Sequence, residues 1–125
     1  MKGSGILQYD DIIKVFRLFR VLMHLSTRNI ANLSSGEAKF SRSLVAAVEV
    51  GTRRPTLGFV LEYGRILQEK SGFKHDIFHI AETCAKDDDF MHLQEVYMAG
   101  KANFYDIYAM MSFILEQEDP QLLWA

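Results

Sequence analysis

The middle of the chain is divided into short segments by residues that typically begin and end helices. Ser and Thr are favoured at helix N-caps because their hydroxyl accepts a hydrogen bond from the first turn, and Gly is favoured just after a helix. The caps are Ser26, Ser41 and Thr56, and the glycines that follow the segments are Gly36, Gly51 and Gly72. This pattern predicts three consecutive short helices over 26–33, 41–51 and 56–70.

Apolar residues recur at helical spacing in the rest of the chain as well. The segment 9–24 has acids at its start and bases toward its end, which suits the helix dipole. Further helices are expected over 76–86 and 104–117, whereas 90–98 fits either a helix or a strand. The predicted apolar stripe of the 56–70 helix is Leu57, Val60, Leu61 and Leu67. The predicted fold class is all-α.

Length and composition restrict the class of protein. A hydrophobic fraction of 49% is enough for a buried core. The length of 125 residues is too short for a large multidomain protein. No apolar stretch approaches the ~20 residues of a membrane-spanning helix, and no hydrophobic signal core follows the N-terminus. We therefore expect a soluble, cytoplasmic protein with no membrane partner. The single cysteine, Cys84, excludes an intrachain disulfide and a thiolate zinc cluster.

The net charge of −2 is the sum of two opposed halves. Residues 1–74 contain twelve Lys and Arg against six acids, a balance of +6, and residues 75–125 contain two Lys against ten acids, a balance of −8. Such a separation indicates that the first part contacts a polyanion and that the second does not.

Catalytic and metal-binding patterns are not found in the sequence. There is no nucleophile–base pair and no phosphate-binding glycine loop, and the spacing of His75 and His79 lacks further ligands for zinc. We expect neither an enzyme nor a metal or cofactor.

Two stretches carry a resemblance to a known family. They are Leu25–Ala31 (LSTRNIA) and Ser41–Leu57 (SRSLVAAVEVGTRRPTL). Together they resemble the phage repressor/Cro-type helix-turn-helix proteins, also called the XRE family, over roughly residues 9–70. The resemblance implies a lambda-repressor-like helix-turn-helix bundle at 9–72, preceded by an extension at 1–8 and followed by additional C-terminal helices at 73–125. It also implies a transcriptional repressor of bacterial or phage origin that binds double-stranded DNA as a homodimer.

The resemblance assigns roles to individual residues. Those expected to contact bases in the major groove, from the helix that starts at Ser41, are Arg42, Ser43 and Ala47. Those expected to contact phosphates are Thr27, Arg28, Ser41, Arg53 and Arg54. Arg20 and Glu49 match positions that pair and orient the recognition helix. An arginine at a helix start can also form a bidentate pair with guanine.

One feature departs from the family pattern. Ala31 and Glu49 are 18 positions apart, about four more than the family usually has, so that 33–40 contains an insertion. Either a longer second helix or a bulged loop at 35–39 would accommodate it.

The acidic half, 73–125, is richer in Met and aromatic residues than one thin helix needs, so these residues form either core or an interface. The candidates for a dimer or partner interface are Tyr105, Tyr108, Met111, Phe113 and Trp124. A rival interpretation is a protein-interaction module on a helix-turn-helix scaffold, such as an antirepressor or an inhibitor of a host nuclease.

Overall fold

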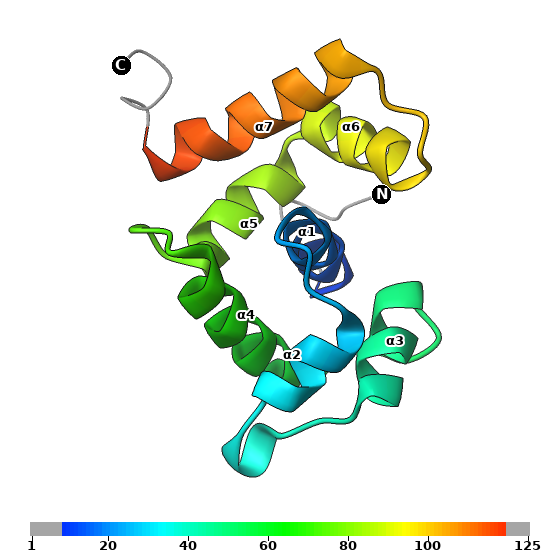
Figure 1. Cartoon of the computed structure of the whole chain (residues 1–125), viewed down its shortest axis with the longest axis vertical. Helices are drawn as coiled ribbons and strands as arrows, with labels where there is room; N and C mark the ends of the chain where they lie inside the picture. Colours follow the sequence, from blue (N-terminus) through cyan, green and yellow to red (C-terminus); the bar gives the residue numbers. More distant parts are fainter. Residues whose placement is uncertain (1–8, 120–125) are drawn as a thin grey trace. The chain divides into compact units, whose positions relative to one another are not determined.

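The computed structural model of the chain describes residues 9–119, and within this range it contains helices and no strand (Figure 1). The predicted all-α fold class is confirmed. The chain divides into two compact units, Met1–Gly72 and Phe73–Ala125. The predicted extension at 1–8 lies outside the described residues.

The first unit packs four α-helices around one core (Figure 1). Its elements are α1 (Tyr9–Leu22), α2 (Thr27–Leu33), the short 3-10 helix η2 (Gly36–Ala38), α3 (Arg42–Val50) and α4 (Leu57–Ser71). Helix α1 contacts α3 and α4, and α2 contacts the same two helices. Helix α3 is therefore held from two sides, by α1 and by α2.

The predicted caps determine where these helices begin. The hydroxyls of Ser26, Ser41 and Thr56 each accept a hydrogen bond from the backbone N–H three residues later, at 3.0–3.1 Å. Gly51 ends α3 and Gly72 ends α4, both in the left-handed conformation that glycine adopts most easily. The three predicted helices are confirmed, with ends within one residue of those expected.

Aromatic side chains fill the core of the first unit. Phe16 contacts Tyr63 with ring centroids 5.4 Å apart, and Phe59 contacts both Tyr63 and Phe40. These rings decide which face of α4 is buried. The predicted stripe of α4 was wrong at two positions, because Leu57 and Leu61 are 55% and 50% exposed. Phe59 and Tyr63 carry more apolar area, and burying them turns the two leucines outward.

The second unit is built from three helices, α5 (Ile77–Lys86), α6 (Asp88–Met98) and α7 (Phe104–Glu118), each in contact with the other two. The segment that fits either a helix or a strand is a helix. Its start is the acidic run: Asp87 caps α6 through the backbone N–H of Phe90, and Asp88 and Asp89 lie in the first turn. Carboxylates there are favourable because a helix N-terminus is partly positive.

The core of the second unit includes Cys84. Burial, with a smaller effect of the nearby Asp87 charge, raises the pKa of Cys84 to about 12, which leaves the thiol protonated and unreactive.

A buried carboxylate lies near the end of α7. Glu118 accepts hydrogen bonds from the backbone N–H groups of Lys74 and His75, at 2.6 and 2.9 Å. These bonds fasten the segment before α5 to the last turn of α7.

Two glycines of the first unit should respond oppositely to alanine. Gly51 has φ +86°, where a side chain is strained, so Gly51→Ala should lower the free energy of unfolding by about 1–2 kcal/mol. Gly58 lies in α4 with no atom closer than 3.9 Å to an added Cβ, so Gly58→Ala should raise it by about 0.5 kcal/mol. Urea unfolding followed by circular dichroism measures both, and equal effects would contradict the assigned backbone conformations.

Candidate nucleic-acid interface

The start of α3 is turned toward solvent. Ser41 caps the helix, and Arg42 and Ser43 in its first turn are both exposed. Val45 and Val48 on the opposite face are buried, while Ala47, one turn further along, is half-buried. Helix α3 thus presents an arginine and a serine at a tip that nothing in its own unit covers.

The loop after α3 is basic and is fastened to the helix that precedes it. Arg53 and Arg54 are exposed. The backbone N–H groups of Thr52 and Arg53 both donate to the carbonyl oxygen of Ala47, at 3.0 and 3.3 Å, and the Thr52 hydroxyl does so at 3.2 Å. The side chains of the two arginines therefore extend from a backbone segment whose position is fixed by α3.

The start of α2 adds a further exposed cation. Ser26 and Asn29 form a capping box, in which each side chain accepts a hydrogen bond from the other residue's backbone N–H. Arg28 is exposed beside it, and Thr27 is half-buried. All residues expected to contact DNA therefore have side chains that are at least partly accessible to solvent.

A buried carboxylate connects the three longer helices of the unit. The side chain of Glu49 on α3 is 2% exposed and accepts two hydrogen bonds from Arg20 of α1, at 2.6 and 2.8 Å. The hydroxyl of Tyr63 on α4 donates to the same carboxylate. Arg20 also donates to the carbonyl oxygen of Leu25, at 2.8 Å, so that the chain entering α2 joins the network.

Burial and charge both act on the pKa values of the groups around Glu49. Burial disfavours the Arg20 cation, but its hydrogen bonds and charge interaction with Glu49 outweigh this and raise its pKa. Burial, followed by the neighbouring Glu49 charge, raises the pKa of Tyr63 well above its ordinary value, which keeps the hydroxyl protonated as a donor. The Arg17 Nε lies 3.7 Å from the same carboxylate, which brings a second cation near it.

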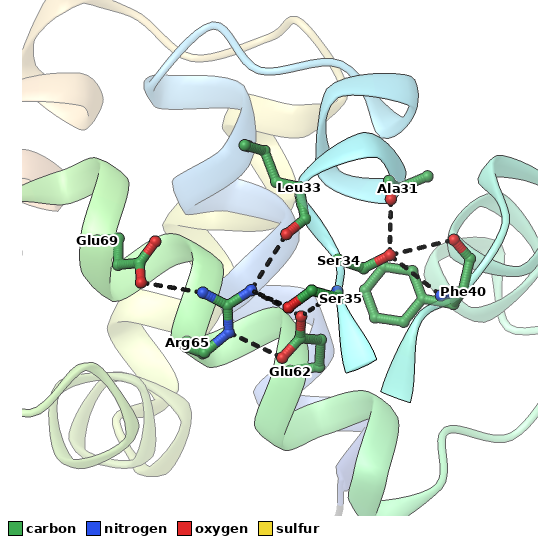
Figure 2. A network of polar contacts seen from close by, with 8 residues as sticks. All are labelled: Ala31, Leu33, Ser34, Ser35, Phe40, Glu62, Arg65 and Glu69. Atoms are coloured by element: carbon green, nitrogen blue, oxygen red, sulfur yellow. Dashed lines mark hydrogen bonds and ion pairs between the residues drawn. The ribbon is translucent and has the colours of Figure 1, made fainter. Parts of the chain in front are cut away.

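The inserted residues between α2 and α3 form a loop rather than a longer helix. Helix α2 ends at Leu33, and Ser34 to Ser41 contain only the single turn η2. The buried Ser34 hydroxyl donates to the carbonyl oxygen of Ala31 at 2.6 Å and accepts from the backbone N–H of Phe40 at 3.1 Å (Figure 2). The two ends of the insertion therefore meet at one hydroxyl.

An ion pair on α4 supports the same loop. Figure 2 shows the guanidinium of Arg65 directed toward Glu62, Glu69 and the backbone carbonyl of Leu33. Its nitrogens donate hydrogen bonds to Glu62 Oε2 at 2.7 Å, to Glu69 Oε1 at 2.9 Å and to the Leu33 carbonyl oxygen at 3.1 Å. Glu62 in turn accepts the backbone N–H of Ser35 at 2.8 Å. The hydrogen bonds from Arg65 are the main cause of a lowered Glu62 pKa, and the bond from Ser35 adds to the lowering against the effect of burial.

The sequence did not predict the hydrogen bond of Tyr63 to Glu49 or the ion pair of Glu62 and Arg65 that binds the loop. Tyr63 gave no signal because an aromatic residue within an apolar helix is expected to be core. The spacing of Glu62, Arg65 and Glu69 fits neighbouring turns of one helix and could have indicated the ion pairs, but not their contact with the loop.

The residues proposed for an interface in the second unit have different surroundings. Tyr105 and Tyr108 are exposed, at 79% and 64%, and Met111 is half-buried. Phe113 packs against Phe90 with ring centroids 5.3 Å apart and so belongs partly to the core of its own unit. Trp124 lies outside the described residues.

No helix among residues 9–119 is both long and apolar enough to cross a membrane. In the same range, no cluster of three or more His, Cys, Asp or Glu side chains could hold a metal ion. Comparisons with known proteins gave no matching family model, curated protein or solved structure.

The Glu49 network makes a strong prediction about stability. Glu49→Gln would leave Arg20 buried without its counter-charge, and breaking a buried ion pair in this way costs about 3–5 kcal/mol. Urea unfolding of the variant should show a loss of this size. Glu69→Gln, which removes an exposed partner of Arg65 that is 64% accessible, is the matched control and should cost less than about 1 kcal/mol. Equal losses in the two variants would contradict a special role for Glu49.

The Glu62 carboxylate predicts a pH effect. Because its folded pKa lies below the ordinary 4.5, the unfolded chain takes up the proton first, and the stabilisation is present above pH 4.5 and lost as the pH falls below it. Glu62→Gln should therefore be less stable than the parent at pH 7, and the difference should narrow at pH 3. Urea unfolding at both values measures it, and a difference independent of pH would refute the assignment.

Proposed function

We propose that this chain is a sequence-specific DNA-binding transcriptional regulator, a repressor by its sequence resemblance, that places α3 in the major groove of double-stranded DNA. The observation that carries the proposal is the exposed start of α3, where Arg42 and Ser43 follow a serine cap on a helix that is fixed from behind. A rigid helix with a polar, cationic tip is the element that many DNA-binding proteins insert into the groove.

The charges around α3 support the proposal. Arg28, Arg53 and Arg54 are exposed on elements that contact or directly follow α3. Contacts of this kind to phosphates position a protein on the duplex, while base contacts give specificity. The net charge of +6 in residues 1–74 agrees with an anionic partner for the first unit. The net charge of −8 in residues 75–125 would repel the same partner from the second unit.

The inserted loop is compatible with groove binding because it is fastened to the body of the first unit. The Ser34 hydroxyl accepts a hydrogen bond from the Phe40 backbone N–H and so joins the two ends of the loop. On α4, Glu62 accepts from the Ser35 backbone N–H, and Arg65 donates to the Leu33 carbonyl. Helices α2 and α3 remain in contact in spite of the extra residues. The proposal therefore does not require the short turn that the family usually has.

A second candidate function is a protein-interaction module. The observation in its favour is the group of exposed aromatic residues on α7, which DNA recognition does not use. A gel-shift assay with random duplex DNA at two salt concentrations separates the two candidates. Salt-sensitive binding supports the DNA-binding proposal, and its absence favours the protein-interaction module.

Two arginines should affect DNA binding in different ways. After selection of a preferred site from random duplexes, Arg42→Ala should reduce discrimination between that site and a single-base variant by about 1–3 kcal/mol, because a base contact is lost. Arg53→Ala should weaken binding to all sequences and reduce the slope of log affinity against log salt by about 0.9, because one phosphate contact is lost. Fluorescence anisotropy titrations at several salt concentrations measure both.

Lys86→Ala is the control for these titrations, since Lys86 is an exposed cation of the second unit that pairs with Glu82. It should leave affinity, specificity and salt slope unchanged. If Arg42→Ala and Arg53→Ala also bind like the parent, the proposed placement of α3 in the groove is wrong.

A further inference from the structure

The carboxylate of Glu49 faces more positive charge than it neutralises. Arg20 and the hydroxyl of Tyr63 together donate three hydrogen bonds to it. Arg17 of α1 approaches the same carboxylate with its Nε at 3.7 Å, which is too long for a hydrogen bond. Two arginines therefore share one carboxylate, and the four side chains together retain one positive charge.

The guanidinium of Arg17 has no hydrogen-bond partner within residues 9–119. Its Nε is the only buried side-chain nitrogen or oxygen in that range that lacks one. The two Nη atoms form no hydrogen bond with the described residues either, and they reach solvent, since the side chain is 41% exposed. Because Nε is the nitrogen nearest Glu49, both Nη atoms lie farther from that carboxylate. Arg17 thus presents unused donors to solvent.

Arg17 lies beside the C-terminal end of α3, where the chain continues into the basic loop. Glu49 is the last residue but one of α3, and Arg53 follows that helix by three residues. The backbone N–H of Arg53 is bonded to the carbonyl oxygen of Ala47, one turn back in α3. Arginines from two separate elements, α1 and the loop, are therefore held near the same helix end.

The position of this helix end relative to the groove gives the cations a purpose. Arg42 and Glu49 are separated by about 10 Å along α3, at ~1.5 Å per residue. The major groove is ~12 Å wide and is bordered by phosphates, so a helix that contacts bases with its first turn brings its last turn near the backbone. A helix C-terminus is partly negative and would by itself repel a phosphate. Cations beside that end remove the repulsion.

We propose that Arg17 binds a backbone phosphate of double-stranded DNA through its Nη atoms, beside the end of α3. Glu49 orients the guanidinium from behind and leaves it charged, because Arg20 already forms the hydrogen bonds to that carboxylate. A planar guanidinium can bond two phosphate oxygens at once. The assignment rests on the proposed DNA binding, and it adds to Arg53 a phosphate contact from α1 that the sequence resemblance does not assign.

A purely structural role would give Arg17 a different signature. If Arg17 served only to hold Glu49, its loss would weaken folding and leave the DNA affinity of the folded chain unchanged. Because Arg20 and Tyr63 already satisfy Glu49, Arg17→Gln should shift the midpoint of urea unfolding by less than about 0.5 M. A larger loss of stability with unchanged DNA binding would place Arg17 in the core network and overturn the phosphate contact.

Fluorescence anisotropy titrations of the full chain with a selected duplex and a random duplex test the contact. Arg17→Gln should reduce the slope of log affinity against log salt by about 0.9, which corresponds to about five- to tenfold weaker binding at ~0.1 M salt. The loss should be the same for both duplexes, because phosphates carry no sequence information. Arg17→Lys keeps the charge and should retain the parent slope and most of the affinity.

Lys70→Gln is the matched control for these titrations. Lys70 is an exposed cation of the same unit in the last turn of α4, two turns beyond Tyr63. Its removal changes the net charge of the unit by the same amount as Arg17→Gln. It should leave the affinity and the salt slope close to those of the parent, and a loss equal to that of Arg17→Gln would show an effect of net charge only.

Inorganic phosphate, added at constant ionic strength, distinguishes the duplex from free phosphate as the ligand. The difference in duplex affinity between the parent and Arg17→Gln should persist in its presence. A difference that disappears would show that Arg17 binds free phosphate and would overturn its assignment to the DNA backbone.

The results also separate this contact from the DNA-binding proposal itself. If the parent shows no salt-sensitive binding, the proposed function fails and the contact fails with it. If Arg53→Ala lowers the salt slope and Arg17→Gln does not, the proposed function stands and only the contact from Arg17 is wrong. A loss in Arg17→Gln that is confined to the selected duplex would mean that Arg17 reads bases, which also contradicts a phosphate contact.

Discussion

The first unit depends on one buried negative charge. Glu49 receives hydrogen bonds from α1 and α4 while belonging to α3, so a single carboxylate fixes the mutual position of three helices. A charge that is 2% exposed is tolerated only where it is fully paired, and Arg20 and Tyr63 provide the pairing. Arg20 extends the constraint to Leu25, just before α2. The orientation of α3, and with it the direction of Arg42, is therefore determined at the opposite end of the helix.

The loop between α2 and α3 is held by different means. Ser34 joins its ends, and the Glu62–Arg65 pair holds its side against α4. None of these contacts involves Glu49. The loop and α3 are thus supported by two separate polar networks on α4, one at Tyr63 and one at Glu62 and Arg65, which point to different sides of α4.

Much of the fold could be predicted from local signals. Caps and glycines gave the helix ends, because their hydrogen bonds and backbone conformations depend on a few neighbouring residues. The predicted buried face of α4 was wrong at two positions, since helical spacing does not show that Phe59 and Tyr63 will take the core positions in place of Leu57 and Leu61. The contacts of Glu62 and Arg65 with the loop span 27–32 residues and leave no trace in local spacing. The expectation that Arg20 pairs with Glu49 came from a resemblance, and the same bond could not have been derived from the residues alone.

The closure at Ser34 also makes the loop a place where the chain can change in length. Ser34 and Phe40 are held together by a hydroxyl that belongs to neither η2 nor α3, so residues added between them would alter little outside the loop. The entropy of closing a loop rises only with the logarithm of its length. This position therefore suits the insertion of a short peptide label, and it is also where related chains could differ in length while keeping the same helices.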